Sequence, residues 1–243
     1  PFVEELESAT RNLYGMGVSQ LIGAHRLRDL IAAIIKPEGM NYGNLPKGLL
    51  TFHRYADGST RTPLEEQLVE GAQTATSATG NVKLHFTVSS DHRDLFKKKL
   101  SETLPEVEKK MGVKFDVSMS EQMPSTDTVA VNLDNTPFRE NGNLVFRPGG
   151  HGALIRNLND IDSTVVFIKN IDNVVPDNRR EATLRYKKIL AGILIEVHDR
   201  IALYLDMLSS GNYTIEDIRR MIAFMHDTLN IRDPKMKQFE DAE

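Results

Sequence analysis

Asp172 stands among short polar side chains at the end of an apolar run, in the segment Lys169-Asn170-Ile171-Asp172-Asn173. Carboxylate and amide oxygens are hard ligands, and Mg²⁺ prefers one or two carboxylates together with phosphate oxygens and water. This pattern predicts that Asp172 binds a magnesium ion that also contacts phosphates. The alternative is structural, because an aspartate at the end of a strand also caps the next segment.

A histidine lies within a glycine loop in Pro148-Gly149-Gly150-His151-Gly152. Glycine adopts positive φ without steric cost and allows a backbone to approach a ligand closely. Gly149, Gly150 and Gly152 are therefore candidates for backbone contacts to a ligand, and His151 is a candidate for a side-chain contact. A glycine turn with a hydrogen-bonded imidazole is the alternative.

Lys47 lies in a loop, Leu45-Pro46-Lys47-Gly48, ahead of an apolar run. A lysine in this position is a candidate for binding phosphate, and an ordinary surface lysine is the alternative. Three histidines show no zinc-ligand spacing, and we expect them to be structural or exposed: His53, His85 and His92.

The chain has 243 residues, a formal net charge of −4 and no cysteine. This length can bury a sizeable core. The slightly acidic charge argues against nucleic acid as the main partner, and the lack of cysteine excludes disulfides, cysteine-ligated zinc and a thiol nucleophile. No apolar run reaches the roughly 18 residues of a membrane span and no signal peptide is present, so we expect a cytoplasmic protein without a membrane partner.

The elements that must position these residues follow from hydrophobic spacing and from glycine and proline. Residues 1–36 are predicted to be helical and to end at Pro37 and Gly39. Thr62 is predicted to cap a helix, with Glu66 near the capping-box position. The predicted strands are 82–88, 113–119, 128–131, 144–146 and 165–168. Further helices are predicted at 63–75, from Ser90 or Asp91 onward, and at 153–158, 184–208 and 214–229. A tight turn is predicted at Asn141-Gly142, and a capping box at Thr214 and Asp217.

The alternation of strands and helices specifies an α/β fold, a mostly parallel sheet with flanking helices. Residues 165–168 are an unbroken β-branched and aromatic run, which is typical of a strand buried on both faces. In such sheets ligands bind at the carboxyl ends of strands, where both the glycine loop and Asp172 fall. We therefore predict a helical lead-in (1–44), an α/β core (45–175) that carries the ligand-binding residues and a C-terminal helical segment (176–243) packed on that core.

Several segments together resemble the UDP-sugar pyrophosphorylases, which have the nucleotide-diphospho-sugar transferase fold. Leu45-Pro46-Lys47-Gly48 resembles a Pro-Lys-Gly phosphate element, Gln122 with Pro124 resembles a Gln and Pro element near the uracil, and the loop 148–152 resembles a Pro-Gly-His-Gly loop. Residues 169–173 are similar to an Asn-x-Asp-Asn segment whose aspartate holds metal and nucleotide. The chain as a whole also resembles an uncharacterised bacterial family known as a domain of unknown function.

The sequence departs from the pyrophosphorylase pattern in several places. Gln122 and Pro124 are closer together than in that family, the glycine loop has an extra glycine, and Ala153 stands where aspartate is common. A Gly-rich loop with an arginine should precede Lys47, and residues 1–44 contain none. Either the chain begins downstream of that loop or the protein lacks it.

The resemblance implies a nucleotidyltransferase that joins a nucleoside triphosphate, with UTP favoured, to a sugar 1-phosphate and releases pyrophosphate. It implies Lys47 and Asp172 as catalytic residues and Asp172 as the ligand of a Mg²⁺ cofactor. Contacts to the nucleotide and the sugar phosphate are implied for Gln122, Gly149, Gly150, His151, Gly152, Lys169 and Asn173. The alternative is a nucleotide-sugar binding or regulatory protein on the same fold without turnover, and the sequence leaves the sugar and the oligomeric state open.

Overall fold

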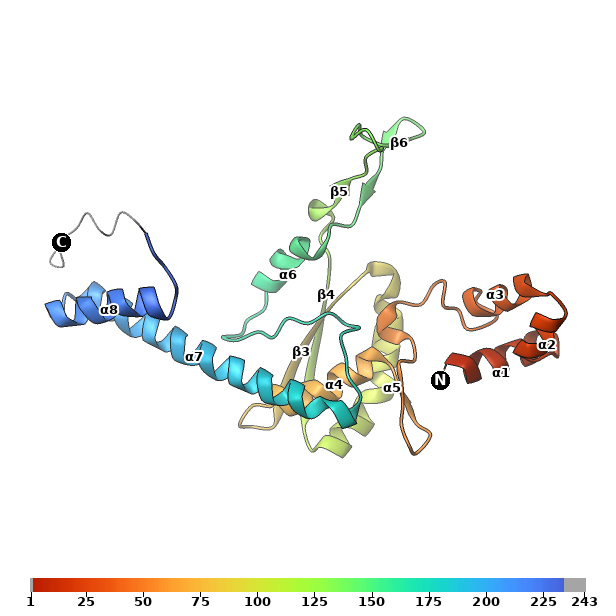
Figure 1. The fold of residues 1–243 in the computed structure, drawn as a ribbon, viewed down its shortest axis with the longest axis horizontal. Helices are drawn as coiled ribbons and strands as arrows, with labels where there is room; N and C mark the ends of the chain where they lie inside the picture. Colours follow the sequence, from red (N-terminus) through yellow and green to blue (C-terminus); the bar gives the residue numbers. More distant parts are fainter. Residues whose placement is uncertain (1, 234–243) are drawn as a thin grey trace. The chain divides into compact units, whose positions relative to one another are not determined.

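The computed structural model describes residues 2–233. In this range it shows a mixed α/β chain with eight α-helices and four two-stranded sheets (Figure 1). The described residues form two compact units, one within 1–184 and one within 185–243. All candidate site residues lie in the first unit.

The lead-in is helical, as predicted, but it consists of three helices that pack on one another: α1 (Phe2–Tyr14), α2 (Val18–Gly23) and α3 (Leu27–Ile35). The pattern of residues 1–36 predicted helical structure but did not predict these breaks. The backbone interrupts it by taking positive φ, 64° at Gly15 and 55° at His25. Leu6, Leu21 and Ala33 are buried where the helices meet.

A 3₁₀ turn and a short hairpin lead into the first core helix: η1 (Lys47–Leu49), β1 (His53–Arg54), β2 (Thr60–Arg61) and α4 (Pro63–Thr74). The predicted cap of α4 is confirmed. The Glu65 N–H donates to Thr62 Oγ1 over 3.3 Å, and the Thr62 N–H donates to Glu65 Oε2 over 2.7 Å. Glu65 completes the capping box because it lies three residues after the cap, and Glu66 is instead buried.

One parallel strand pair forms the centre of the first unit. Its strands run in register from Asn81 opposite Lys114 to Val88 opposite Glu121. A helix connects them, as predicted: β3 (Asn81–Val88), η2 (Ser90–His92), α5 (Arg93–Met111) and β4 (Lys114–Glu121). Apolar side chains of α4, β3 and α5 make the core: Leu64, Leu68, Phe86, Val88, Phe96 and Leu100.

The larger parallel sheet that we predicted is not formed within residues 2–233, where β3 and β4 are the only parallel pair. Residues 165–168 are not a strand, and Val166, Phe167 and Ile168 are 37%, 37% and 77% exposed. The prediction of a buried strand there is wrong. A β-branched run becomes a strand only where a neighbouring strand and a covering layer are present, and the residue pattern specifies neither.

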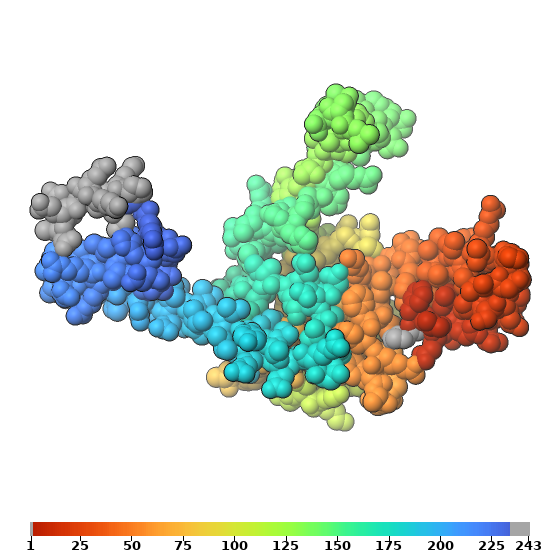
Figure 2. Space-filling model, in the orientation of Figure 1, coloured from red at the N-terminus to blue at the C-terminus, as the bar shows by residue number. Residues whose placement is uncertain are grey.

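Two small antiparallel hairpins occupy the exposed segment that is green in Figure 2. At the predicted turn, Asn141 and Gly142 have φ of 49° and 81°, and a two-residue hairpin turn of this kind requires both values to be positive. The turn is therefore confirmed. The elements of this region are η3 (Pro124–Thr126), β5 (Thr128–Val129) paired with β8 (Phe146–Arg147), β6 (Arg139–Glu140) paired with β7 (Asn143–Leu144), η4 (His151–Leu154) and α6 (Ile155–Asn159).

The C-terminal region contains η5 (Asp177–Arg179), the long helix α7 (Arg180–Ser210) and α8 (Ile215–Asp227). The predicted capping box of α8 is confirmed, because the Asp217 N–H donates to Thr214 Oγ1 over 3.2 Å and the Thr214 N–H donates to Asp217 Oδ2 over 2.9 Å. Residues 234–243 of the predicted helical segment lie outside the described residues. Among residues 2–233, no helix has both the length and the apolar character that crossing a membrane requires.

Candidate functional site

The structure brings together two predicted site residues that are 125 positions apart in the chain. Lys47 Nζ donates a hydrogen bond to Asp172 Oδ2 over 3.0 Å. Both side chains reach solvent, with 72% of Lys47 and 33% of Asp172 exposed. An exposed ion pair contributes little to folding, so a ligand can replace this contact at little cost.

Asp172 is held in its ionised form. The hydrogen bond from Lys47 lowers the pKa of Asp172 below its ordinary value, and the backbone N–H of Asp172 lowers it further. Desolvation acts in the opposite direction, and the electrostatic effects of Lys47 and His151 again favour the carboxylate. The carboxylate is therefore available to a cation at neutral pH.

Close packing at Gly48 places Lys47 beside Asp172. A Cβ atom at Gly48 would lie 2.8 Å from Phe96 Cζ and 2.9 Å from Ile171 Cγ1. Ile171 directly precedes Asp172 and packs against the core, so the absence of a side chain at Gly48 lets the lysine turn approach the aspartate segment. Our sequence analysis assigned no role to Gly48 or Ile171, although both lie inside the motifs that it singled out.

Gly48→Ala should lower the free energy of unfolding by about 1–3 kcal/mol, because an added methyl group overpacks the site next to Phe96 and Ile171. Urea denaturation measures the change. The matched control is Gly152→Ala, where an added Cβ meets no atom within 4 Å. If Gly48→Ala stays within about 0.5 kcal/mol of wild type, as a surface substitution would, the packing argument fails.

Helix α4 holds the backbone just before Asp172. Gln67 Nε2 donates to the carbonyl oxygens of Asn170 and Ile171 over 3.2 and 3.3 Å. The Asn173 N–H donates to the Asn170 carbonyl over 3.1 Å, so the predicted ligand contact Asn173 lies in a tight turn around Asp172. This turn is positioned by hydrogen bonds to a helix rather than by a strand.

Lys169 is a second anchor of the same segment. Its Nζ donates to both carboxylate oxygens of Glu70, over 2.9 and 2.7 Å, and both side chains are largely shielded from solvent. We predicted Lys169 as a contact to the substrate. In the structure its ammonium group is bound by Glu70, so it fixes the segment that carries Asp172.

The structure also brings Gln122 into contact with the glycine loop. Gln122 Nε2 lies 3.4 Å from the Gly149 carbonyl oxygen and 3.4 Å from Thr126 Oγ1. A Cβ at Gly149 would lie 2.7 Å from the Thr126 carbonyl oxygen and 2.9 Å from Ala153 Cβ. Close packing therefore requires glycine at this position.

At Gly150 and Gly152, neither the backbone conformation nor the surrounding atoms require glycine. None of Gly149, Gly150 and Gly152 has positive φ, and a Cβ at Gly150 or Gly152 would meet no atom within 4 Å. This corrects the expectation that the loop depends on positive φ. His151 begins η4 and is exposed, which leaves its imidazole accessible to a ligand.

No group of three His, Cys, Asp or Glu side chains within the described part of the chain is arranged to hold a metal ion. Within the described residues, Asp172 would therefore hold a metal with at most one further side chain of these types. Mg²⁺ fits such a position, because it keeps several waters and combines one or two carboxylates with the phosphates of a substrate. Zinc does not fit, because it requires three or four protein ligands.

The family model described as Domain of unknown function (DUF4301) matches residues 1–243. The chain belongs to the DUF4301 family. It matches no curated protein and no solved structure. Membership in a domain-of-unknown-function family is thus confirmed, whereas the resemblance to UDP-sugar pyrophosphorylases receives no support from these comparisons.

The DUF4301 chain contains a second charge cluster that the sequence analysis did not predict, centred on Glu66. Glu66 lies in α4 and is 1% exposed. Its carboxylate accepts hydrogen bonds from the β1–β2 hairpin and from the start of α7, that is, from His53, Tyr55, Arg61 and Arg180. A glutamate one position from the capping-box residue gives no sequence signal of such burial.

Asp177 extends this cluster toward the site. Its Oδ1 accepts from Arg61 Nη1 over 2.8 Å and from Arg180 Nη1 over 2.6 Å. Arg180 Nη2 also donates to the Val175 carbonyl over 3.1 Å. The chain that follows Asp172 is therefore tied to α4, as is the chain that precedes it.

The cluster predicts a loss of stability at high pH. Burial and the hydrogen bond to Glu66 raise the pKa of Tyr55 to about 12. The unfolded chain releases the tyrosine proton near pH 10, the ordinary value, so the unfolded state binds fewer protons than the folded state between pH 10 and 12 and stability falls in that window. The free energy of unfolding, measured by urea denaturation at several pH values, should fall less steeply in this window for Tyr55→Phe than for wild type. An identical fall in this variant would contradict the assignment, and Tyr213→Phe, which alters an exposed side chain, is the control.

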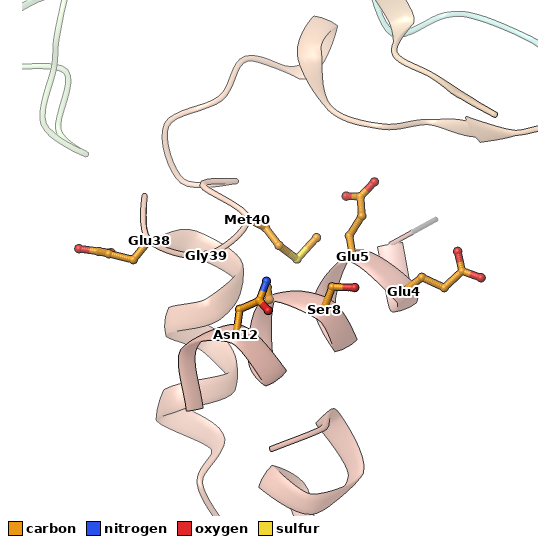
Figure 3. Close-up of a pocket in the computed structure, with 8 residues that line it drawn as sticks. Glu4, Glu5, Ser8, Asn12, Glu38, Gly39 and Met40 are labelled. Atoms are coloured by element: carbon orange, nitrogen blue, oxygen red, sulfur yellow. The ribbon is translucent and has the colours of Figure 1, made fainter. Parts of the chain in front are cut away.

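A separate hollow of about 480 Å³ lies between α1 and the turn at 38–40 (Figure 3). Three glutamates contribute to its lining, together with polar and apolar residues: Glu4, Glu5, Glu38, Ser8, Asn12 and Met40. Glu4 pairs with Arg54, and Glu5 accepts a hydrogen bond from the Tyr42 hydroxyl over 3.0 Å. None of the predicted site residues lines this hollow, and its carboxylates would repel phosphates.

Proposed function

We propose that Lys47 and Asp172 form the phosphate- and metal-binding centre of a nucleotidyltransferase with a nucleotide-diphospho-sugar transferase-like fold. Its substrates would be a nucleoside triphosphate, with UTP favoured, and a sugar 1-phosphate. An oxygen of the sugar phosphate bonds to the α-phosphorus while the bond from that phosphorus to the β-phosphate oxygen breaks. The products are a nucleotide sugar and pyrophosphate.

The exposed ion pair between Lys47 and Asp172 carries this proposal. It contributes little to folding, yet contacts of neighbouring residues position both partners: Gly48 packs against Ile171, and Gln67 binds the backbone before Asp172. An accessible ammonium and an accessible carboxylate held together in this way suit a phosphate and its magnesium ion. Lys47 would offset phosphate charge, and Asp172 would hold Mg²⁺, which supplies further charge neutralisation at the phosphates.

The remaining predicted residues would surround the nucleotide. Gln122 follows the last residue of β4 and reaches Gly149, and ligands of parallel sheets bind at such strand ends. By the resemblance, Gln122 and the loop backbone would contact the base, and His151 would contact sugar or phosphate. The β3–α5–β4 unit is the part of the structure that agrees with the proposed transferase-like fold.

A nucleotide-sugar binding or regulatory protein without turnover is the second candidate, and the position of Lys169 favours it. Because Glu70 binds Lys169, Lys47 supplies most of the positive charge beside Asp172. In-line transfer requires charge stabilisation around the whole triphosphate, whereas binding needs less. This candidate keeps the same site and the same Mg²⁺ requirement.

A coupled pyrophosphate assay and titration calorimetry with UTP, Mg²⁺ and a panel of sugar 1-phosphates separate the candidates. Pyrophosphate release that is lost in Lys47→Gln supports the transferase. Mg²⁺-dependent nucleotide binding without release supports the binding protein. If the wild-type chain neither binds nor turns over any nucleotide tested, the proposed function is wrong.

A further inference from the structure

Helix α7 carries a face on which the charges reverse sign about Gly192. Arg185, Lys188, Gly192, Glu196 and Asp199 follow one another at spacings of three and four residues, which places them on one side of the helix. The two positive side chains precede the glycine and the two negative ones follow it. Lys188 and Glu196 are equally far from Gly192, as are Arg185 and Asp199, and all four are exposed.

The centre of this Gly192 face is apolar and open. Ile189 and Ile195 lie three residues before and three residues after Gly192, and they are 45% and 47% exposed. A Cβ on Gly192 would meet no atom within 4 Å. Glycine inside a helix is unfavourable by about 1 kcal/mol relative to alanine, so the helix itself gains nothing from it.

Helix α8 packs elsewhere on α7. The Phe224 ring lies 5.5 Å from the Tyr204 ring and 5.5 Å from the Arg200 guanidinium. Among the described residues of the second unit, Met221 and Phe224 are the buried apolar side chains. Among the described residues of its own unit, the Gly192 face therefore has no cover.

We propose that α7 pairs in antiparallel orientation with α7 of a second copy of this chain, with the crossing point at Gly192. A two-fold interface uses the same patch on both chains, so that patch must be complementary to itself. Antiparallel pairing places Arg185 opposite Asp199 of the second copy, and Lys188 opposite Glu196. It also gathers the Ile189 and Ile195 side chains of both copies on the two flanks of the crossing point and allows the two backbones to approach at Gly192.

The reversal of charge sign identifies a second copy of the chain as the partner that covers the Gly192 face. It also requires the two α7 helices to run antiparallel. Parallel pairing would place like charges opposite one another, and a partner of a single charge sign would be repelled by half of the face. The paired segment, 185–199, is about 22 Å long at 1.5 Å per residue, which is short for a protein interface. The dimer should therefore dissociate at micromolar concentration and weaken as salt is added.

Charge reversal tests the pairing in the full 243-residue chain. R185E/K188E makes all four charges of the face negative, and E196K/D199K makes them all positive. Sedimentation velocity should show a concentration-dependent dimer for wild type, monomers for each double variant alone, and a one-to-one heterodimer when the two variants are mixed. A wild type that stays monomeric at all concentrations overturns the proposal, as does a double variant that dimerises like wild type.

Gly192→Leu separates dimerisation from folding. In the monomer the added side chain enters open space and raises helix propensity, so the thermal midpoint at low concentration should be unchanged or higher. At the crossing point the same side chain would keep the two helices apart and weaken the dimer at least about tenfold, which corresponds to about 1.4 kcal/mol. An unaltered dimer dissociation constant would overturn the crossing at Gly192.

Discussion

Glu66→Gln is expected to lower the free energy of unfolding by about 3–5 kcal/mol, the typical cost of removing one partner from a buried ion pair. Arg180 is 3% exposed and Glu66 is 1% exposed, so water cannot replace the lost charge. Arg61 also loses a partner. Urea denaturation, with the midpoint and the slope both recorded, measures the effect.

The matched control is Glu65→Gln in the next position of α4. Glu65 accepts the Thr62 N–H in the capping box and pairs with Lys99 over 2.8 Å. Its loss should cost only about 1 kcal/mol, as cap substitutions do. If the two variants are equally stable, the Glu66 cluster does not stabilise the fold in the way that its burial indicates.

Asp172→Asn is expected to lower the Mg²⁺-dependent affinity for UTP by about 100-fold or more, because the metal then loses the Asp172 carboxylate. The stability of the fold should change little, since the contact with Lys47 is an exposed ion pair. Titration calorimetry at fixed Mg²⁺ measures the affinity, and urea denaturation verifies the fold.

Asp134→Asn is the control for this experiment. Asp134 is also an exposed aspartate with a lowered pKa, caused first by the hydrogen bond from the Thr136 hydroxyl. It lies in the segment between β5 and β6, and its hydrogen bonds go to Thr136 rather than to Lys47. An Asp172→Asn variant that binds UTP as tightly as Asp134→Asn would remove Asp172 from the metal site.

The amino-acid sequence by itself determined the elements whose causes are local. The Thr62 cap, the Thr214 capping box and the Asn141-Gly142 turn appear as predicted, because each depends on side chains and φ values within four residues. Helix α5 and strands β3 and β4 also agree with the residue pattern, since periodicity reports which face an element buries. The motif residues Lys47, Gln122 and Asp172 were named from sequence as well.

Only the tertiary structure decided what those residues contact. Residues 165–168 have the composition of a buried strand, yet no neighbouring strand pairs with them among the described residues. Lys169 was predicted to contact the substrate, and the structure shows that its ammonium group pairs with Glu70. The Glu66 cluster joins α4 to Arg180, 114 residues away, and Lys47 meets Asp172 across 125 residues. Pairings of this kind depend on how the chain packs, because a charged residue has the same sequence signal whether water or a distant side chain is its partner.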